Sequence, residues 1–74
     1  MSIDAQEYQK KFGQRIKQLR ISINFSQLDL AVACGLEKTA ISRIENGRTN
    51  ITLKTALILR AALNVELKDL FDLD

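Results

Sequence analysis

The sequence predicts an all-α domain of five helices, and three observations lead to this fold class. Apolar side chains recur at intervals of three or four residues along most of the chain, which is the spacing of one helix face. Residues that favour helix ends, such as Ser26, Gly35 and Asn64, stand at the breaks in this pattern. No proline interrupts the pattern between Gln27 and Asn46. We expect residues 1–74 to form a single helical domain.

The first predicted helix is long and amphipathic. Asp4 followed by Glu7 resembles a capping box at its start, and Asn24 is suited to a left-handed terminator. Gly13 lies inside the helix, which close packing against a neighbour would explain. The apolar face consists of Tyr8, Phe12, Ile16, Leu19 and Ile23. The opposite face is either an ordinary solvated surface or part of a basic one, and it carries Lys10, Lys11, Arg15 and Lys17.

Two short helices follow, from about Gln27–Cys34 and from about Lys38–Glu45. Ser26 can cap the first of them, and Gly35 can take the positive φ of a sharp turn. Helices that cross at about 90–120° need a small side chain where their axes approach, and Ala31 supplies it. The expected apolar positions are Leu28, Leu30, Ala31, Cys34, Leu36, Ile41 and Ile44. Helices two and three therefore form a helix-turn-helix.

The last third of the chain predicts two more helices. Asn46 and Gly47 form a turn-favouring pair, and the polar residues through Asn50 form a loop. Thr52 can cap a fourth, mostly apolar helix that ends at Asn64 and that we expect to be central. A short fifth helix follows it. This fifth helix carries more apolar residues than one small core can hide, namely Val65, Leu67, Leu70, Phe71 and Leu73.

Composition excludes several classes of function. Apolar residues make up 46% and charged residues 27%, which is ordinary for a soluble globular domain. One cysteine and no histidine leave no parts for a zinc site or for Cys/His or Ser/His catalysis, so we expect no enzymatic activity, metal, cofactor or small-molecule ligand. Cys34 is interpreted as a small buried hydrophobe rather than a redox sensor. No apolar run could span a bilayer and no signal segment opens the chain, so we expect a cytoplasmic protein.

Charge is divided unevenly along the chain. The formal net charge of +2 is small, but residues 1–54 carry nine Lys or Arg against five Asp or Glu. Residues 55–74 carry two against four. The basic part contains the helix-turn-helix and the acidic part does not. This division favours nucleic acid as the partner of the basic part.

These features resemble the Cro and phage-repressor family of helix-turn-helix proteins, also called XRE-like or lambda-repressor-like. The resemblance covers nearly the whole chain, and its motifs are Ile16–Arg20, Ser26–Gln27, Gly35–Ile44, Glu45–Arg48 and Leu63–Phe71. The short format and the run Arg48–Thr52 look most like the controller proteins of restriction-modification systems. Three positions depart from the family's usual pattern: Glu37 replaces a Ser or Thr cap, Ala40 is smaller than usual, and Ile51 stands where proline is frequent.

The resemblance implies a five-helix lambda-repressor-like fold and a set of DNA-binding residues. Those that read base edges in the major groove would be Lys38, Thr39, Ser42 and Arg43 on the third helix. Those that hold phosphates would be Ser26, Gln27, Arg48, Thr49, Asn50 and Thr52. Arg20 and Glu45 match a family ion pair that ties the first helix to the end of the third. Without DNA binding, the base and phosphate candidates would be ordinary polar residues of a helix surface or loop.

The chain is therefore predicted to be a transcriptional regulator that binds a two-fold-related operator in double-stranded DNA as a homodimer. We place the dimer contact in the fifth helix, at Leu67, Phe71 and Leu73. Leu67 is expected to be the most exposed of these, because Phe71 matches a family position that packs inward. The alternative is an antitoxin-like protein-interaction module with secondary DNA binding. Sequence-dependent retention of DNA in a shift assay would distinguish the two.

Overall fold

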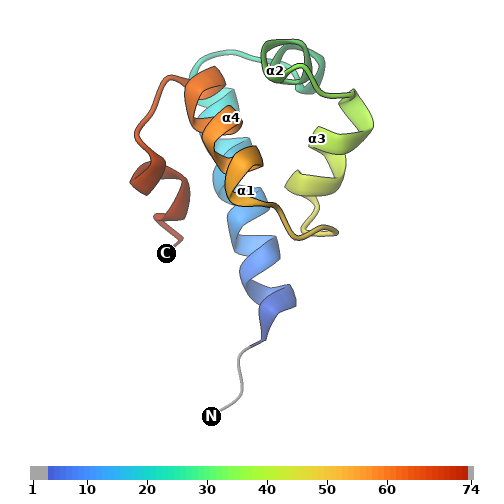
Figure 1. Ribbon diagram of the computed structural model, residues 1–74, viewed down its shortest axis with the longest axis vertical. Coiled ribbons are helices and arrows are strands. Elements are labelled where there is room, and N and C mark those ends of the chain that lie inside the picture. The colour runs from blue at the N-terminus through green and yellow to red at the C-terminus, as the bar shows by residue number, and fades with distance from the viewer. Residues whose placement is uncertain (1–3, 74) are drawn as a thin grey trace.

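The computed structural model describes residues 4–73, and helices make up most of this range (Figure 1). The elements in chain order are α1 (Ala5–Ser22), α2 (Gln27–Cys34), α3 (Lys38–Glu45), α4 (Leu53–Leu63) and the 3-10 helix η1 (Leu67–Phe71). No strand occurs among the described residues. The predicted all-α class is confirmed, and so are the two short helices that form the helix-turn-helix.

The fifth segment is a short 3-10 helix and not the α helix that the sequence predicted. Two polar contacts and one buried side chain hold this segment in place. Arg15 Nε donates to the Asp69 carbonyl at 2.8 Å, and the Asp69 carboxylate accepts from the Glu66 backbone N–H at 2.9 Å. Leu70 is fully buried in the core and anchors the segment.

The helix ends are set by local side-chain contacts and by backbone conformation. The Asp4 carboxylate accepts from the Glu7 backbone N–H at 3.2 Å and caps α1. Thr52 caps α4 in the same way, at 3.1 Å. Asn24 and Asn64 take left-handed φ values of 61° and 57° where the sequence predicted helix ends. These local signals explain why the helix boundaries follow from the sequence so closely.

The core draws at least one large side chain from every element. Its fully buried members are Ile16, Leu30, Ile41, Leu59, Leu63 and Leu70. α3 and η1 lie on opposite sides of α1 and both pack on it (Figure 1). Because one cluster joins α2 and α3 to the remaining elements, the helix-turn-helix is held in a fixed position on α1.

Several apolar side chains that the sequence placed in the core are exposed instead. Tyr8 and Ile23 stand at the two ends of the apolar face of α1 and are only partly covered. Leu28 is 56% exposed, because Leu30, Ala31 and Cys34 form the buried side of α2. α4 contributes Ala56, Leu59 and Leu63 to the core. Its first two leucines, Leu53 and Leu57, are exposed to solvent.

Gly13 explains how closely α1 approaches α3. A Cβ atom at this position would lie 2.6 Å from the Glu45 carbonyl oxygen and closer still to that of Ile44. A side chain here would force one of the two helices to move, because packed interiors have no room for an added carbon. The close packing predicted at Gly13 is confirmed. It brings the end of α3 onto the middle of α1.

Candidate nucleic-acid interface

α3 presents one polar face to solvent. Ile41 and Ile44 are buried on its inner side, so the positions on the opposite side of the helix point outward. The four predicted base-reading residues lie on α3 with three of them, Lys38, Thr39 and Arg43, exposed and the fourth, Ser42, half-buried. Their spacing places them in two adjacent pairs, one turn apart. A short exposed helix with this donor-rich face has the dimensions and chemistry that the major groove accepts.

The N-terminus of α3 is open. Among residues 4–73, no side chain makes a cap bond to it, and Glu37 has the extended backbone of a cap residue without the bond. The Glu37 carboxylate instead accepts weakly from the Thr39 hydroxyl at 3.5 Å. Free backbone N–H groups and the helix dipole therefore favour negative charge at this end of α3.

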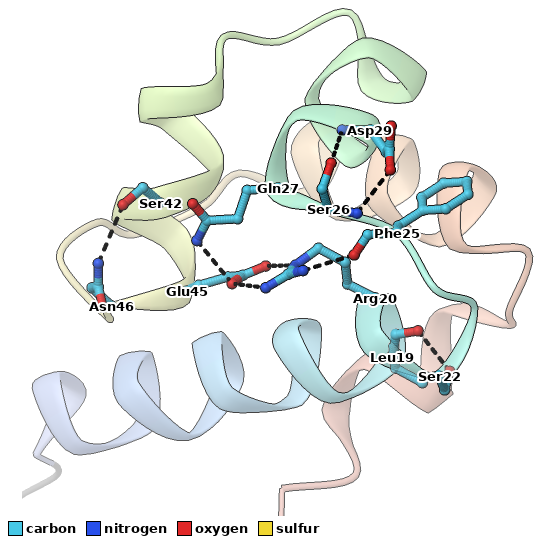
Figure 2. Close-up of polar contacts among 10 residues, drawn as sticks. All are labelled: Leu19, Arg20, Ser22, Phe25, Ser26, Gln27, Asp29, Ser42, Glu45 and Asn46. Carbon is cyan, nitrogen blue, oxygen red and sulfur yellow. Dashed lines mark hydrogen bonds and ion pairs between the residues drawn. The ribbon is translucent and has the colours of Figure 1, made fainter.

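A buried ion pair joins α1 to the end of α3 (Figure 2). Arg20 Nε and Nη2 donate to the two carboxylate oxygens of Glu45 at 2.6 and 3.0 Å, and Nη1 donates to the Phe25 carbonyl at 2.7 Å. Arg20 and Glu45 are 8% and 7% exposed. The hydrogen bond to Glu45 raises the pKa of Arg20 against the opposing effect of burial. This two-point contact fixes the angle between α3 and α1.

Gln27 extends the same network to the start of α2. Its Nε2 donates to Glu45 Oε1 at 3.1 Å, and the residue is half-buried (Figure 2). The sequence predicted a phosphate contact for Gln27 and gave no sign of this link, since the two residues are 18 positions apart. One carboxylate therefore contacts both the first helix and the first residue of α2.

Ser26 caps α2 in a reciprocal pair with Asp29. Ser26 Oγ accepts from the Asp29 backbone N–H at 3.0 Å, and the Asp29 carboxylate accepts from the Ser26 backbone N–H at 2.8 Å. Hydrogen bonds from the backbone and then the side chain of Ser26 lower the pKa of Asp29. Because the backbone N–H of Ser26 is already used, a phosphate contact from Ser26 has to come from its hydroxyl, in place of the bond to the Asp29 carboxylate.

The loop after α3 holds the remaining predicted phosphate contacts. Arg48 and Asn50 are exposed, and the Arg48 backbone N–H donates to α3 at 2.9 Å, which folds the loop back against that helix. Thr49 is half-buried, and Thr52 uses its hydroxyl oxygen to cap α4. Gln9 of α1 donates to the Asn50 side-chain oxygen across 41 positions. Sequence reasoning missed Gln9, because nothing local to it indicates that contact.

An apolar groove lies between α1, the loop after α3, and the C-terminal segment. The ring of Phe71 packs against Phe12 with 5.3 Å between centroids, yet Phe71 remains 51% exposed. Tyr8 is 50% exposed beside it. The groove has a volume of about 440 Å³, and Ile51 and Leu73 also line it. This groove is the part of the surface where exposed aromatic side chains gather.

The predicted order of exposure among the dimer residues is wrong. Leu67 is half-buried and packs against the core, whereas Phe71 is exposed. The 3-10 geometry of η1 explains the reversal, since residues three apart lie on the same face and Leu67 therefore shares the side of the buried Leu70. Phe71 turns away from that side. Leu73 is half-buried.

The chemistry that this surface offers is hydrogen bonding and charge. In the part of the chain that the structure describes, no group of three His, Cys, Asp or Glu side chains could hold a metal ion. Burial raises the pKa of the Cys34 thiol, which makes it a poor nucleophile. No helix within residues 4–73 combines the length and the apolar character needed to cross a membrane.

The fold and this surface define a class, that of DNA-binding helix-turn-helix proteins. The family model described as Helix-turn-helix matches residues 16–70, from the middle of α1 to η1. This chain belongs to the helix-turn-helix family, which is a family of DNA-binding transcriptional regulators and not of enzymes.

Individual relatives narrow the class. The control protein C.BamHI of Bacillus amyloliquefaciens is 45% identical over 62 residues, which cover 82% of this chain and 76% of that protein. The control protein C.MunI of Mycoplasma sp is 36% identical over 62 residues, covering 82% and 84%. The crystal structure of the restriction-modification controller protein C.AhdI from Aeromonas hydrophila matches with a TM-score of 0.83 and 38% identity, over 85% of this chain and 96% of that one. The resemblance to controller proteins is confirmed.

Proposed function

We propose that this chain, as a single domain, is a transcriptional regulator that binds a two-fold-related operator in double-stranded DNA as a homodimer. The observation that carries the proposal is the exposed polar face of α3, held at a fixed angle by the buried pair Arg20 and Glu45. Similarity to the control proteins of restriction-modification systems supports the narrower role of a controller in such a system.

α3 enters the major groove with its outward face toward the base edges. Arg43 can donate two parallel hydrogen bonds to guanine O6 and N7, and Lys38 can reach the same acceptors as a point charge. Thr39 can bond a base or pack its methyl group against thymine. The Ser42 hydroxyl accepts from Asn46 Nδ2 at 3.3 Å, which leaves its proton free to donate to a base.

Phosphate contacts from both flanks of α3 hold it in the groove. At the start of α2, Gln27 and the Ser26 hydroxyl join the positive end of the helix dipole. In the loop after α3, the contacts come from Arg48, Thr49, Asn50 and Thr52. These contacts set the register and orientation of α3 and carry no sequence information themselves.

Two copies pair through the apolar groove beside α1. The half-exposed rings of Phe71 and Tyr8 support this pairing, because contiguous exposed apolar surface on a small domain marks an interaction site. Leu73 lines the same groove, whereas Leu67 contributes less because it already packs against the core. Symmetric pairing places two α3 helices in successive major grooves, about 34 Å or roughly 10 base pairs apart.

Selection of bound fragments from a random duplex pool tests the proposed function. We expect a motif with two related halves whose centres lie about one helical turn apart. Shift assays on that motif should give a Kd of about 10⁻⁸–10⁻¹¹ M at physiological salt. A pool that yields no motif, with equal binding to all sequences, would overturn the regulator and favour a protein-interaction module.

A further inference from the structure

Besides the buried Arg20, α1 carries four cationic side chains whose surroundings differ. Arg15 is engaged by the C-terminal segment, through a backbone hydrogen bond of 2.8 Å and a carboxylate 3.9 Å away. The Lys11 ammonium lies 5.4 Å from the centre of the Tyr8 ring. Lys10 and Lys17 form no ion pair with any residue in the range 4–73. Lys10 differs from Lys17 because it lies against Gly47.

Lys10 packs against the turn that follows α3. Gly47 in that turn has φ of +69°, and a Cβ atom there would lie 2.7 Å from both the Cα and the Cγ atoms of Lys10. The backbone and the start of the side chain of Lys10 therefore lie against Gly47, while the residue remains exposed. One helical turn further along α1, Gly13 approaches the Glu45 carbonyl in the same way. α1 thus crosses the end of α3, with Lys10 against Gly47, the residue before Arg48.

In the proposed binding mode, the first residues of the recognition helix meet base edges, and the loop after it contacts phosphates through Arg48. Arg48 follows Gly47 directly, and Lys10 lies against Gly47 from α1. We infer that Lys10 binds a DNA phosphate next to the one held by Arg48. The inference rests on the proposed function, since it requires α3 to occupy the groove. Lys10 precedes residues 16–70, the part that matches the family model.

A purely local role for Lys10 has a different signature. The last carbonyl groups of α3 carry partial negative charge, and a cation beside them stabilises the helix. That role appears as a lower unfolding temperature of a variant in the absence of DNA. A phosphate contact appears in the salt dependence of binding, because each neutralised phosphate releases condensed counterions.

The matched variants are Lys10→Gln and Lys11→Gln, which remove the same charge from adjacent exposed positions that face different neighbours. Affinity for one fixed duplex is measured from about 50 to 200 mM salt, where losing one phosphate contact lowers the slope of log K against log salt by about 0.9. Over that range Lys10→Gln should lose roughly 3.5-fold less affinity than the wild type. Lys11→Gln should keep the wild-type slope, and Lys10→Arg should restore it.

An unchanged slope for Lys10→Gln overturns the inference, and an unchanged slope with a lower unfolding temperature assigns Lys10 to the α3 dipole instead. An equal fall for Lys11→Gln also overturns it, because the charge would then act at long range and not at one phosphate. If the wild type binds no duplex, both this contact and the proposed function are refuted. Normal wild-type binding with an unaltered Lys10→Gln slope rejects the contact alone.

Discussion

The two sides of α1 are built in opposite ways. On the α3 side, Arg20, Glu45 and Gln27 form a buried polar network, and no buried side-chain nitrogen or oxygen in the described part of the chain lacks a partner. On the η1 side, Phe71 and Tyr8 each leave half of their surface in water. The α3 side is therefore complete within one chain, and the η1 side leaves apolar area that another molecule can cover.

This difference fits the proposed task of each side of α1, which is to orient α3 on one side and to pair with a second copy on the other. A helix that reads base edges needs a fixed orientation, and charge-assisted hydrogen bonds at two points supply one because they depend strongly on angle. A surface that joins two copies needs buried apolar area, which is not directional. The distribution of polar and apolar contacts around α1 supports the proposal of base reading on the α3 side and pairing on the η1 side.

The largest expected effect comes from breaking the α3 side with Arg20→Ala. This change leaves the Glu45 carboxylate buried without its cation, which costs about 3–5 kcal/mol in a buried pair. Because about 1 kcal/mol shifts the midpoint by roughly 4–8 °C in a domain of this size, thermal unfolding should begin at least about 12 °C lower. The matched control is Lys17→Ala, since Lys17 is an exposed cation of the same helix and forms no ion pair with any residue in the range 4–73. Equal shifts for the two variants would show that burial of the Arg20 pair is unimportant.

The second largest effect is expected from Phe71→Glu, which disrupts the apolar surface on the η1 side. A carboxylate at this position would face its symmetry mate across the two-fold axis, where like charges oppose association. Sedimentation should show monomer at concentrations at which the wild type is dimeric. Val32→Glu is the matched control, because Val32 is 73% exposed on α2, outside the groove. A Phe71→Glu protein that remained dimeric would move the interface away from η1.

The sequence predicted well what local contacts decide. The bounds of α2 and α3 agree with the prediction. At α2, Ser26 caps the first turn and the left-handed Gly35 ends the helix, and both act on residues close to them in the chain. The left-handed conformation of Asn24 and the close approach at Gly13 followed from the same kind of local argument. Such features require no knowledge of how distant segments meet.

The sequence failed where tertiary neighbours decide. Leu28 fits the apolar spacing of α2, but it lies outside the side of the helix that faces the core. The exposures of Leu67 and Phe71 are the reverse of those predicted, because η1 has three residues per turn and not 3.6. The bonds from Gln27 to Glu45 and from Gln9 to Asn50 join residues far apart in the chain. The DNA contacts themselves stay predictions.

A smaller effect is expected from changes on the proposed base-reading face of α3 and in the network of Arg20, Glu45 and Gln27 behind it. Arg43→Ala should relax the preference at one base pair and cost about 1–3 kcal/mol there, with no loss of thermal stability, because Arg43 is exposed. Gln27→Ala should weaken binding evenly across sequences, since it removes a phosphate donor. Selection from a random duplex pool with each variant measures both outcomes. An unchanged motif and affinity for Arg43→Ala would place the reading face elsewhere.

The smallest effect concerns Asp29, at the start of α2. Hydrogen bonds from the Ser26 backbone and then its side chain lower the pKa of Asp29 from its usual value of 3.8. A carboxyl group with a lowered pKa in the folded state stabilises the fold above its unfolded pKa, and this contribution is lost as the pH falls through the lowered value. The contribution lies within one chain. It should therefore not depend on protein concentration, unlike the effect of Phe71→Glu.

Asp29→Asn should lower the unfolding midpoint slightly at neutral pH, and its difference from the wild type should vanish as the pH falls well below 3.8. Ser26→Ala is the contrasting variant, because it removes a neutral cap whose loss costs about 0.5–2 kcal/mol. The Asp29 backbone N–H loses its acceptor at every pH, so part of that deficit should persist in acid. Midpoints measured at several protein concentrations across this pH range compare the two. A deficit of Asp29→Asn that persisted in acid would mean that the shape of the side chain, and not its charge, secures the start of α2.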